Sequence, residues 1–154
     1  MKRIILITIS LSLIGIIAFF IYFVAGVSST YPPIKKYEYI GSPNQLIDSI
    51  RKYVVNHPDM TLKITDITGN KKNGYATYIT IETKNIEYNI KCEEDNSEIN
   101  SNKTILGIVG IYDKIRKTGG YSPEARGISA LIPAFDRDVL KPLRDNHHIQ
   151  INPL

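Results

Sequence analysis

The sequence predicts an α+β domain preceded by an N-terminal transmembrane helix. Three observations indicate this architecture: an uncharged run near the N-terminus, two amphipathic helical patterns, and a stretch between them in which apolar and polar residues alternate. A helix, about four antiparallel strands and a C-terminal helix, in that order, are typical of an α+β domain. We expect both helices to pack on one face of the sheet. The length of 154 residues fits one domain.

The uncharged run covers residues 4–27 and follows a short basic head at residues 1–3. As a helix it would be about 36 Å long, enough to cross a hydrocarbon core of about 30 Å. Lys2 and Arg3 favour an N-terminus inside and a C-terminal domain outside the cytoplasm, although Lys35 and Lys36 flank the other end. A cleavable signal peptide is the alternative, but its apolar stretch is normally shorter, about 7 to 15 residues. We therefore expect a single-pass membrane protein anchored through this run.

Residues 28–36 are predicted to be a tether, stiffened by Pro32 and Pro33, and the folded domain is expected over residues 37–146. Its first helix starts at Ser42-Pro43-Asn44-Gln45, which combines an N-cap serine, a proline in the first turn and a capping-box glutamine. The helix is expected to end before Pro58, because proline disfavours helical geometry in the residue that precedes it.

Between residues 61 and 112 the apolar period changes to two, which predicts strands. The first strand begins near Leu62, the second covers residues 75–81, the third 86–92 and the fourth 104–112. One face of the third strand is predicted to carry Ile86, Tyr88, Ile90 and Cys92, and the other Glu87, Asn89 and Lys91. The second helix follows from apolar residues spaced by three and four between Leu131 and Leu143.

Two prolines and the C-terminus complete this pattern. Pro133 is expected in the first turn of the second helix, and Pro142 is expected to kink that helix or end it early. Residues 147–154 are predicted to be a solvated tail.

The charge balance argues against nucleic-acid binding. The net charge of +4 falls to +2 when Lys2 and Arg3 are left out, so the remainder of the chain is nearly neutral. Nucleic-acid binding would require a basic stripe on one face of the domain.

One motif pair resembles the active site of another class of protein. Ser49-Ile50-Arg51-Lys52 and Lys117-Thr118-Gly119 resemble two of the three signatures of penicillin-binding proteins and serine β-lactamases. The third signature, S-D-N, is missing, and the chain is too short for that fold. We therefore interpret Ser49 and Lys52 as residues of a solvated helix face.

Other reactive residues do not form a recognisable catalytic or metal-binding pattern. Cys92 has no second cysteine with which to form an intramolecular disulfide. A small envelope enzyme of the hydrolase type, using Cys92 or Ser49 with His57, is an alternative that rests on residue types alone. We predict no catalytic residues, metal or cofactor, and the His147-His148 pair, Glu93-Glu94 and the Asp136/Asp138 pair are expected to be solvated.

Cations gather around a glycine pair in the predicted loop after the fourth strand. Backbone amides at a glycine turn, together with nearby cations, can hold an anion. This loop predicts either a plain surface turn or a site for an anionic ligand or a partner. The residues concerned are Lys114, Arg116, Lys117, Gly119, Gly120, Tyr121 and Arg126.

Tyrosines are frequent in the predicted strands, and tyrosine offers a large contact area with a polar tip. Tyr78 has the opposite parity to Ile79 and Ile81, so it is expected to face away from the core. We therefore expect a membrane-anchored, non-catalytic domain that binds another protein or assembles at the membrane surface, with Tyr78 and the glycine loop as candidate contact residues.

Overall fold

The computed structural model describes residues 15–17, 19, 31–70, 74–95, 102–147 and 149–154. The chain divides into two units, Met1–Tyr31 and Pro32–Leu154. Most of the predicted anchor at residues 4–27 and the first part of the predicted tether lie outside the described residues. Within the described part of the chain, no helix is both long and apolar enough to cross a membrane.

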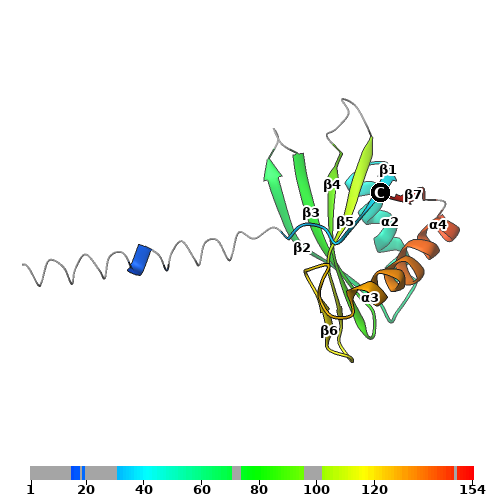
Figure 1. Cartoon of the computed structure of the whole chain (residues 1–154). Helices are drawn as coiled ribbons and strands as arrows, with labels where there is room; N and C mark the ends of the chain where they lie inside the picture. Colours follow the sequence, from blue (N-terminus) through cyan, green and yellow to red (C-terminus); the bar gives the residue numbers. More distant parts are fainter. Residues whose placement is uncertain (1–14, 18, 20–30, 71–73, 96–101, 148) are drawn as a thin grey trace, which may run out of the picture. The chain divides into compact units, whose positions relative to one another are not determined.

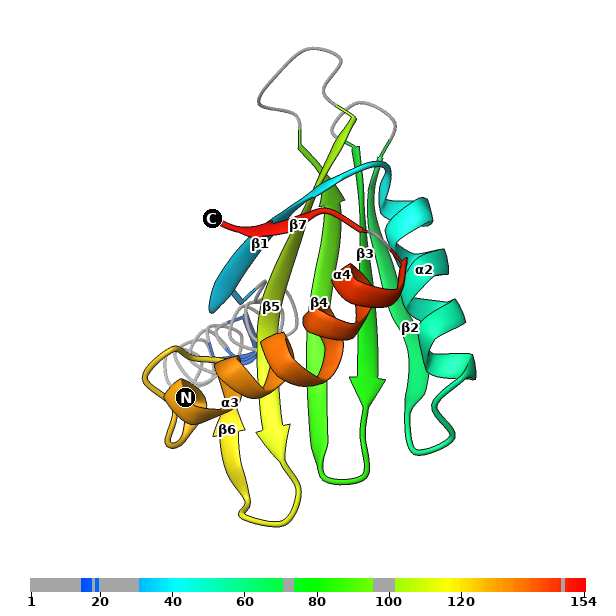
Figure 2. The same cartoon turned by 90° about the vertical axis from the view of Figure 1, so that its right-hand side faces the viewer.

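The unit Pro32–Leu154 is an α+β domain with a seven-stranded antiparallel sheet, whose helices lie on one face (Figures 1 and 2). The strands follow the spatial order β2-β3-β4-β5-β1-β7, and β6 pairs with β5. The predicted class and antiparallel sheet are confirmed, and the four predicted strands correspond to β2–β5. The strands are β1 (Lys35–Ile40), β2 (Thr61–Asn70), β3 (Gly74–Glu82), β4 (Ile86–Glu94), β5 (Lys103–Asp113), β6 (Thr118–Gly120) and β7 (Ile151–Pro153).

Helix α2 (Pro43–Val55) begins with the predicted capping box. The Gln45 amide donates to Ser42 Oγ at 3.4 Å, and the Ser42 amide donates to Gln45 Oε1 at 2.9 Å. These two bonds satisfy backbone donors that the first helical turn would otherwise leave free. The apolar face of α2 is buried through Leu46, Ile47, Ile50, Tyr53 and Val54.

The strands alternate as predicted, and the alternation separates a core face from a polar face. In β4, Tyr88, Ile90 and Cys92 are fully buried, whereas Glu87, Asn89 and Lys91 are partly exposed. The side chains buried on the core face pack with those of the helices in one hydrophobic cluster. Burial of this apolar surface is the main force that holds the helices against the sheet.

The C-terminal helical region consists of α3 (Ile128–Phe135), a π-helix η1 (Asp136–Leu140) and α4 (Lys141–His147). The prediction placed its start near Leu131 and Pro133 in the first turn, but the helix begins at Ile128 and Pro133 lies inside it. Pro142 does not end the helical region, which continues to His147. The extra residue of the π-turn, in which the Lys141 amide donates to the carbonyl of Asp136, comes directly before this proline.

Two predicted non-sheet segments supply strands. Lys35 and Lys36, which were predicted to belong to the tether, begin β1, which pairs with β5. The predicted solvated tail at 147–154 contains β7, which pairs with β1. Ile149 and Ile151 from this segment are buried, so it belongs to the core.

Candidate functional site

The face of the sheet opposite the helices is the candidate functional surface, and we call it the open face. The registers of β2 with β3, β3 with β4 and β4 with β5 place polar and aromatic side chains side by side on it. Tyr112 is 40% exposed, and Tyr121, which follows β6, is 45% exposed. The open face is formed by Lys63, Tyr78, Thr80, Glu82, Glu87, Asn89, Lys91, Gly107, Gly110 and Tyr112.

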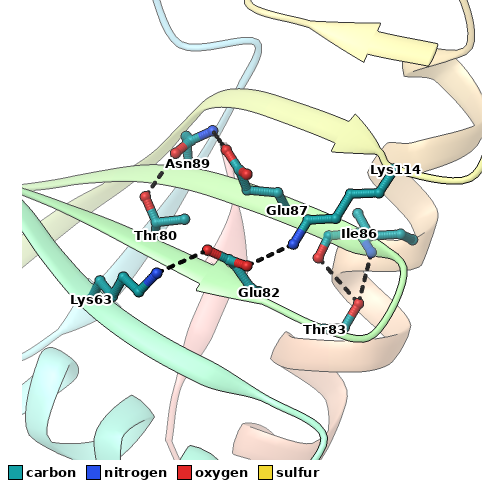
Figure 3. A network of polar contacts seen from close by, with 8 residues as sticks. All are labelled: Lys63, Thr80, Glu82, Thr83, Ile86, Glu87, Asn89 and Lys114. Carbon is teal, nitrogen blue, oxygen red and sulfur yellow. Dashed lines mark hydrogen bonds and ion pairs between the residues drawn. The ribbon is translucent and has the colours of Figure 1, made fainter. Parts of the chain in front are cut away.

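Two carboxylates are paired directly across β3 and β4 at the centre of a polar network (Figure 3). Glu82 stands opposite Glu87, and like charges at opposed positions are destabilising. Lys114 Nζ donates to Glu82 Oε2 at 2.6 Å, and Lys63 Nζ donates to Glu82 Oε1 at 3.4 Å, so cations approach Glu82 from two sides. The hydrogen bond from Lys114, more than any other contact, lowers the pKa of Glu82 below its usual value. Glu82 is therefore held as a carboxylate and is unsuited to act as a general acid near neutral pH.

The second carboxylate is held by an amide. Asn89 Nδ2 donates to Glu87 Oε1 at 2.9 Å, while its Oδ1 accepts from the Thr80 hydroxyl at 2.8 Å (Figure 3). Asn89 Nδ2 also lies 3.5 Å from the Tyr121 hydroxyl. Asn89 thus connects β3, β4 and the segment after β6 in one network.

Tyr121 lies against β5 because Gly110 has no side chain. A Cβ atom at Gly110 would lie 2.7 Å from two ring carbons of Tyr121. The glycine therefore allows the aromatic ring to rest on the backbone of β5. This close approach brings Tyr121, a predicted contact residue, onto the open face.

Three backbone amides of the predicted anion loop are already engaged within the protein. Asp113 Oδ1 accepts from the amides of Ile115 and Arg116 at 2.9 and 2.8 Å, and the Gly119 amide donates to the Arg126 carbonyl at 2.8 Å. Lys117 adopts a positive φ of 52° at the hairpin turn. This arrangement weighs against an anion cradle, since such a cradle needs free amides that point at the ligand.

The predicted contact residues are therefore divided between two places. Tyr78, Lys114 and Tyr121 reach the open face, whereas Arg116 and Lys117 lie at the tip of the β5–β6 hairpin and are exposed. Gly119 and Gly120 form part of β6, and the side chain of Arg126 is exposed on the segment that leads to α3.

Glu82, Glu87 and Asn89 were not predicted as site residues from the sequence. Alternation correctly placed Glu87 and Asn89 on the polar face, but the pairing register that aligns Glu82 with Glu87 is set by the short turn at Thr83–Asn85. There the Thr83 hydroxyl accepts from the Ile86 amide at 3.0 Å.

The residues of the alternative enzyme hypothesis are not assembled. Cys92 is fully buried, and burial raises the pKa of its thiol to about 12, so the nucleophilic thiolate is strongly disfavoured. The Ser49 hydroxyl donates to the Gln45 carbonyl at 2.8 Å, and His57 Nδ1 donates to the Tyr53 carbonyl at 2.7 Å. Ser49 and His57 are thus each engaged in a hydrogen bond with a backbone carbonyl four residues earlier in the chain. Among the described residues, no group of His, Cys, Asp and Glu is placed to hold a metal ion.

Comparisons with known proteins assign no family or function to this site. The chain matches no known family, and no similar protein was found among curated proteins or solved structures.

Proposed function

We propose that the protein is a membrane-anchored, non-catalytic interaction domain that binds another protein through the open face of its sheet. The observation that carries this proposal is the one-sided packing of the fold. The helices cover one face of the sheet (Figure 2). The other face presents Tyr78, Tyr112 and Tyr121 beside a polar network. Tyrosines are enriched at protein interfaces because they combine apolar area with a polar tip.

The charges on this side of the sheet favour a protein partner over a polyanion. Lys91 pairs with Glu93 at 2.5 Å, and Lys103 pairs with Glu38 at 3.2 Å. Lys63 and Lys114 both pair with Glu82. Binding to a phosphate backbone depends on cations that are free to neutralise phosphates, whereas each of these lysines already contacts a carboxylate of the protein itself.

The membrane anchor is the second part of the proposal and rests on the sequence. Residues 4–27 carry no charge and are long enough, as a helix, to cross a bilayer. With the basic head inside, the interaction domain would lie outside the cytoplasm, where a partner in the same envelope could reach it.

Site-specific photocrosslinking in the native host tests the proposed surface. A photoreactive phenylalanine analogue replaces Tyr78 or Tyr112 on the open face, and, as a matched control, the exposed Lys141 at the start of α4. We expect the same covalent partner from positions 78 and 112 and none from 141. Absence of a product from both open-face positions, or equal products from all three, would contradict binding through the open face.

A further inference from the structure

Strand β2 forms an edge of the sheet and is long and exposed. It pairs with β3 along one side, and in the described part of the chain no strand pairs with its other side. Ile64 is 47% exposed and Ile67 is 60% exposed, so the edge also presents apolar side chains. A long edge strand with exposed apolar residues is a template for pairing with another strand.

A β-bulge in this edge strand gives it an unusual distribution of charge. Lys63 is opposite Thr80 and Asp66 is opposite Tyr78, with the register shift between Ile64 and Asp66. Thr80 and Tyr78 are two residues apart and therefore share one face of β3. The bulge thus brings Lys63 and Asp66 to the same face, whereas three residues apart in a regular strand they would lie on opposite faces.

We propose that two copies of this chain pair through their β2 strands, antiparallel, about a twofold axis that passes between Ile64 and Thr65. In this register Lys63 of each copy stands opposite Asp66 of the other, which gives two ion pairs on the open-face side. On the helix side of the sheet, Leu62 of each copy stands opposite Ile67 of the other. This pairing would join the two sheets into one continuous sheet.

Charge complementarity favours a second copy of the chain as the partner of β2, and it favours one register of the two strands. Antiparallel partners must present side chains on the same face, which leaves a small set of registers. Registers that place Lys63 against Lys63, or Asp66 against Asp66, are penalised by like charges directly opposite each other. The edge is complementary to itself under the proposed twofold, so a second copy supplies Asp66 with a cation and gives Lys63, which contacts Glu82 of its own chain at 3.4 Å, a second carboxylate. This proposal uses an edge of the sheet and is independent of the open-face partner.

Zero-length crosslinking of the full chain in detergent tests the contact itself. Unlabelled and ¹⁵N-labelled chains are mixed and treated with a carbodiimide, which joins an amine to a carboxylate in contact, and the linked peptides are identified by mass spectrometry. We expect a Lys63 to Asp66 link between a light and a heavy chain. The Lys63 to Glu82 link, whose atoms are 3.4 Å apart within one chain, is the internal control. Recovery of the Lys63 to Glu82 link without any mixed link would overturn the proposal.

Charge exchange tests the register. Lys63→Asp and Asp66→Lys should each abolish the mixed crosslinked dimer, detected by its mass with an amine-reactive crosslinker, because each variant places like charges opposite each other. The double variant K63D/D66K should restore it. The control Lys52→Asp changes an exposed charge on α2 and should leave the dimer unchanged. If the double variant stays as monomeric as the single variants while all melt as the wild type does, the proposed register is wrong.

Discussion

At the scale of single residues, the open face depends on which donors hold two opposed carboxylates. Glu82 and Glu87 face each other across β3 and β4, and each is held by a donor, Lys114 in one case and Asn89 in the other. Because Lys114 comes from the β5–β6 hairpin turn, its ion pair also fastens that turn to β3. A polar network that satisfies its own members in this way fixes the register of the strands that carry it.

The Lys114→Gln variant tests this role through its pH dependence. The folded-state pKa of Glu82 is lowered, so its ion pair contributes stability above the unfolded pKa, about 4.3, and loses that contribution as pH falls through the folded pKa. We expect the variant to be less stable than the wild type by at most about 1 kcal/mol at pH 7, as for other partly exposed ion pairs. Urea unfolding of both proteins should show this difference shrinking in acid. A difference that is the same at neutral and at strongly acidic pH would contradict the assignment to Glu82.

At the scale of secondary-structure elements, a proline and a tyrosine together explain how α2 is joined to the C-terminal helices. In an α-helix the amide of residue 142 would donate to the carbonyl of residue 138, but Pro142 has no amide hydrogen. The Tyr53 hydroxyl from α2 donates to the Asp138 carbonyl at 3.0 Å in its place. The bond that proline removes from one helix is thus supplied by a side chain of another.

Replacing Tyr53 with phenylalanine should leave that carbonyl without its donor. The aromatic ring, which is buried, is retained, so the expected loss of stability is that of one hydrogen bond to a part-buried acceptor, about 1 kcal/mol. Tyr112→Phe, which removes a hydroxyl from the exposed open face, should change stability little. Chemical denaturation of the two variants against the wild type measures the difference. Equal stability of both variants would show that water satisfies the Asp138 carbonyl equally well.

The same elements show which parts of the fold the sequence predicts. The start of α2 is encoded locally by its capping box, and β2–β5 by alternation, so each was predicted from a short window. Strands β1, β6 and β7 were missed because they are short, and they are strands only through pairing with distant residues. The π-helix was missed for the same reason, since the Tyr53 contact that compensates Pro142 comes from a residue 85 positions away.

For the candidate site, the sequence predicted which face of the sheet a side chain occupies, but not which residues it contacts there. The orientation of Tyr78 follows from a period of two, and the open face contains it as expected. The approach of Tyr121 to Gly110 and the pairing of Lys114 with Glu82 depend on the path of the β5–β6 hairpin. Such contacts are set by tertiary structure, and a local pattern contains no signal for them.

At the scale of the whole domain, the two ends of the unit Pro32–Leu154 meet in the sheet. β7 pairs with β1, and the Leu154 amide donates to the Lys36 carbonyl at 3.1 Å. Arg144 Nε in α4 donates to the Ile151 carbonyl at 2.9 Å and so holds the returning chain. The most C-terminal strand of this unit therefore pairs with its most N-terminal strand, and the fold depends on residues that the sequence pattern alone marks as a tail.

Deletion of residues 149–154 tests this dependence. It removes Ile149 and Ile151, which are buried, and it uncovers the β1 edge that carries the buried Tyr37 and Tyr39. Burial of one large aliphatic side chain contributes about 1.5 to 3 kcal/mol, so we expect the truncated chain to lose about 3 kcal/mol or more. For a domain whose total stability is typically about 5 to 15 kcal/mol, such a loss should be evident as a large fall in the urea midpoint. Deletion of Leu154 alone, whose side chain is 66% exposed, is the control and should cost far less. If the six-residue deletion unfolds at the same midpoint as this control, β7 is an accessory strand, and α2 to α4 with the remaining six strands suffice for the core.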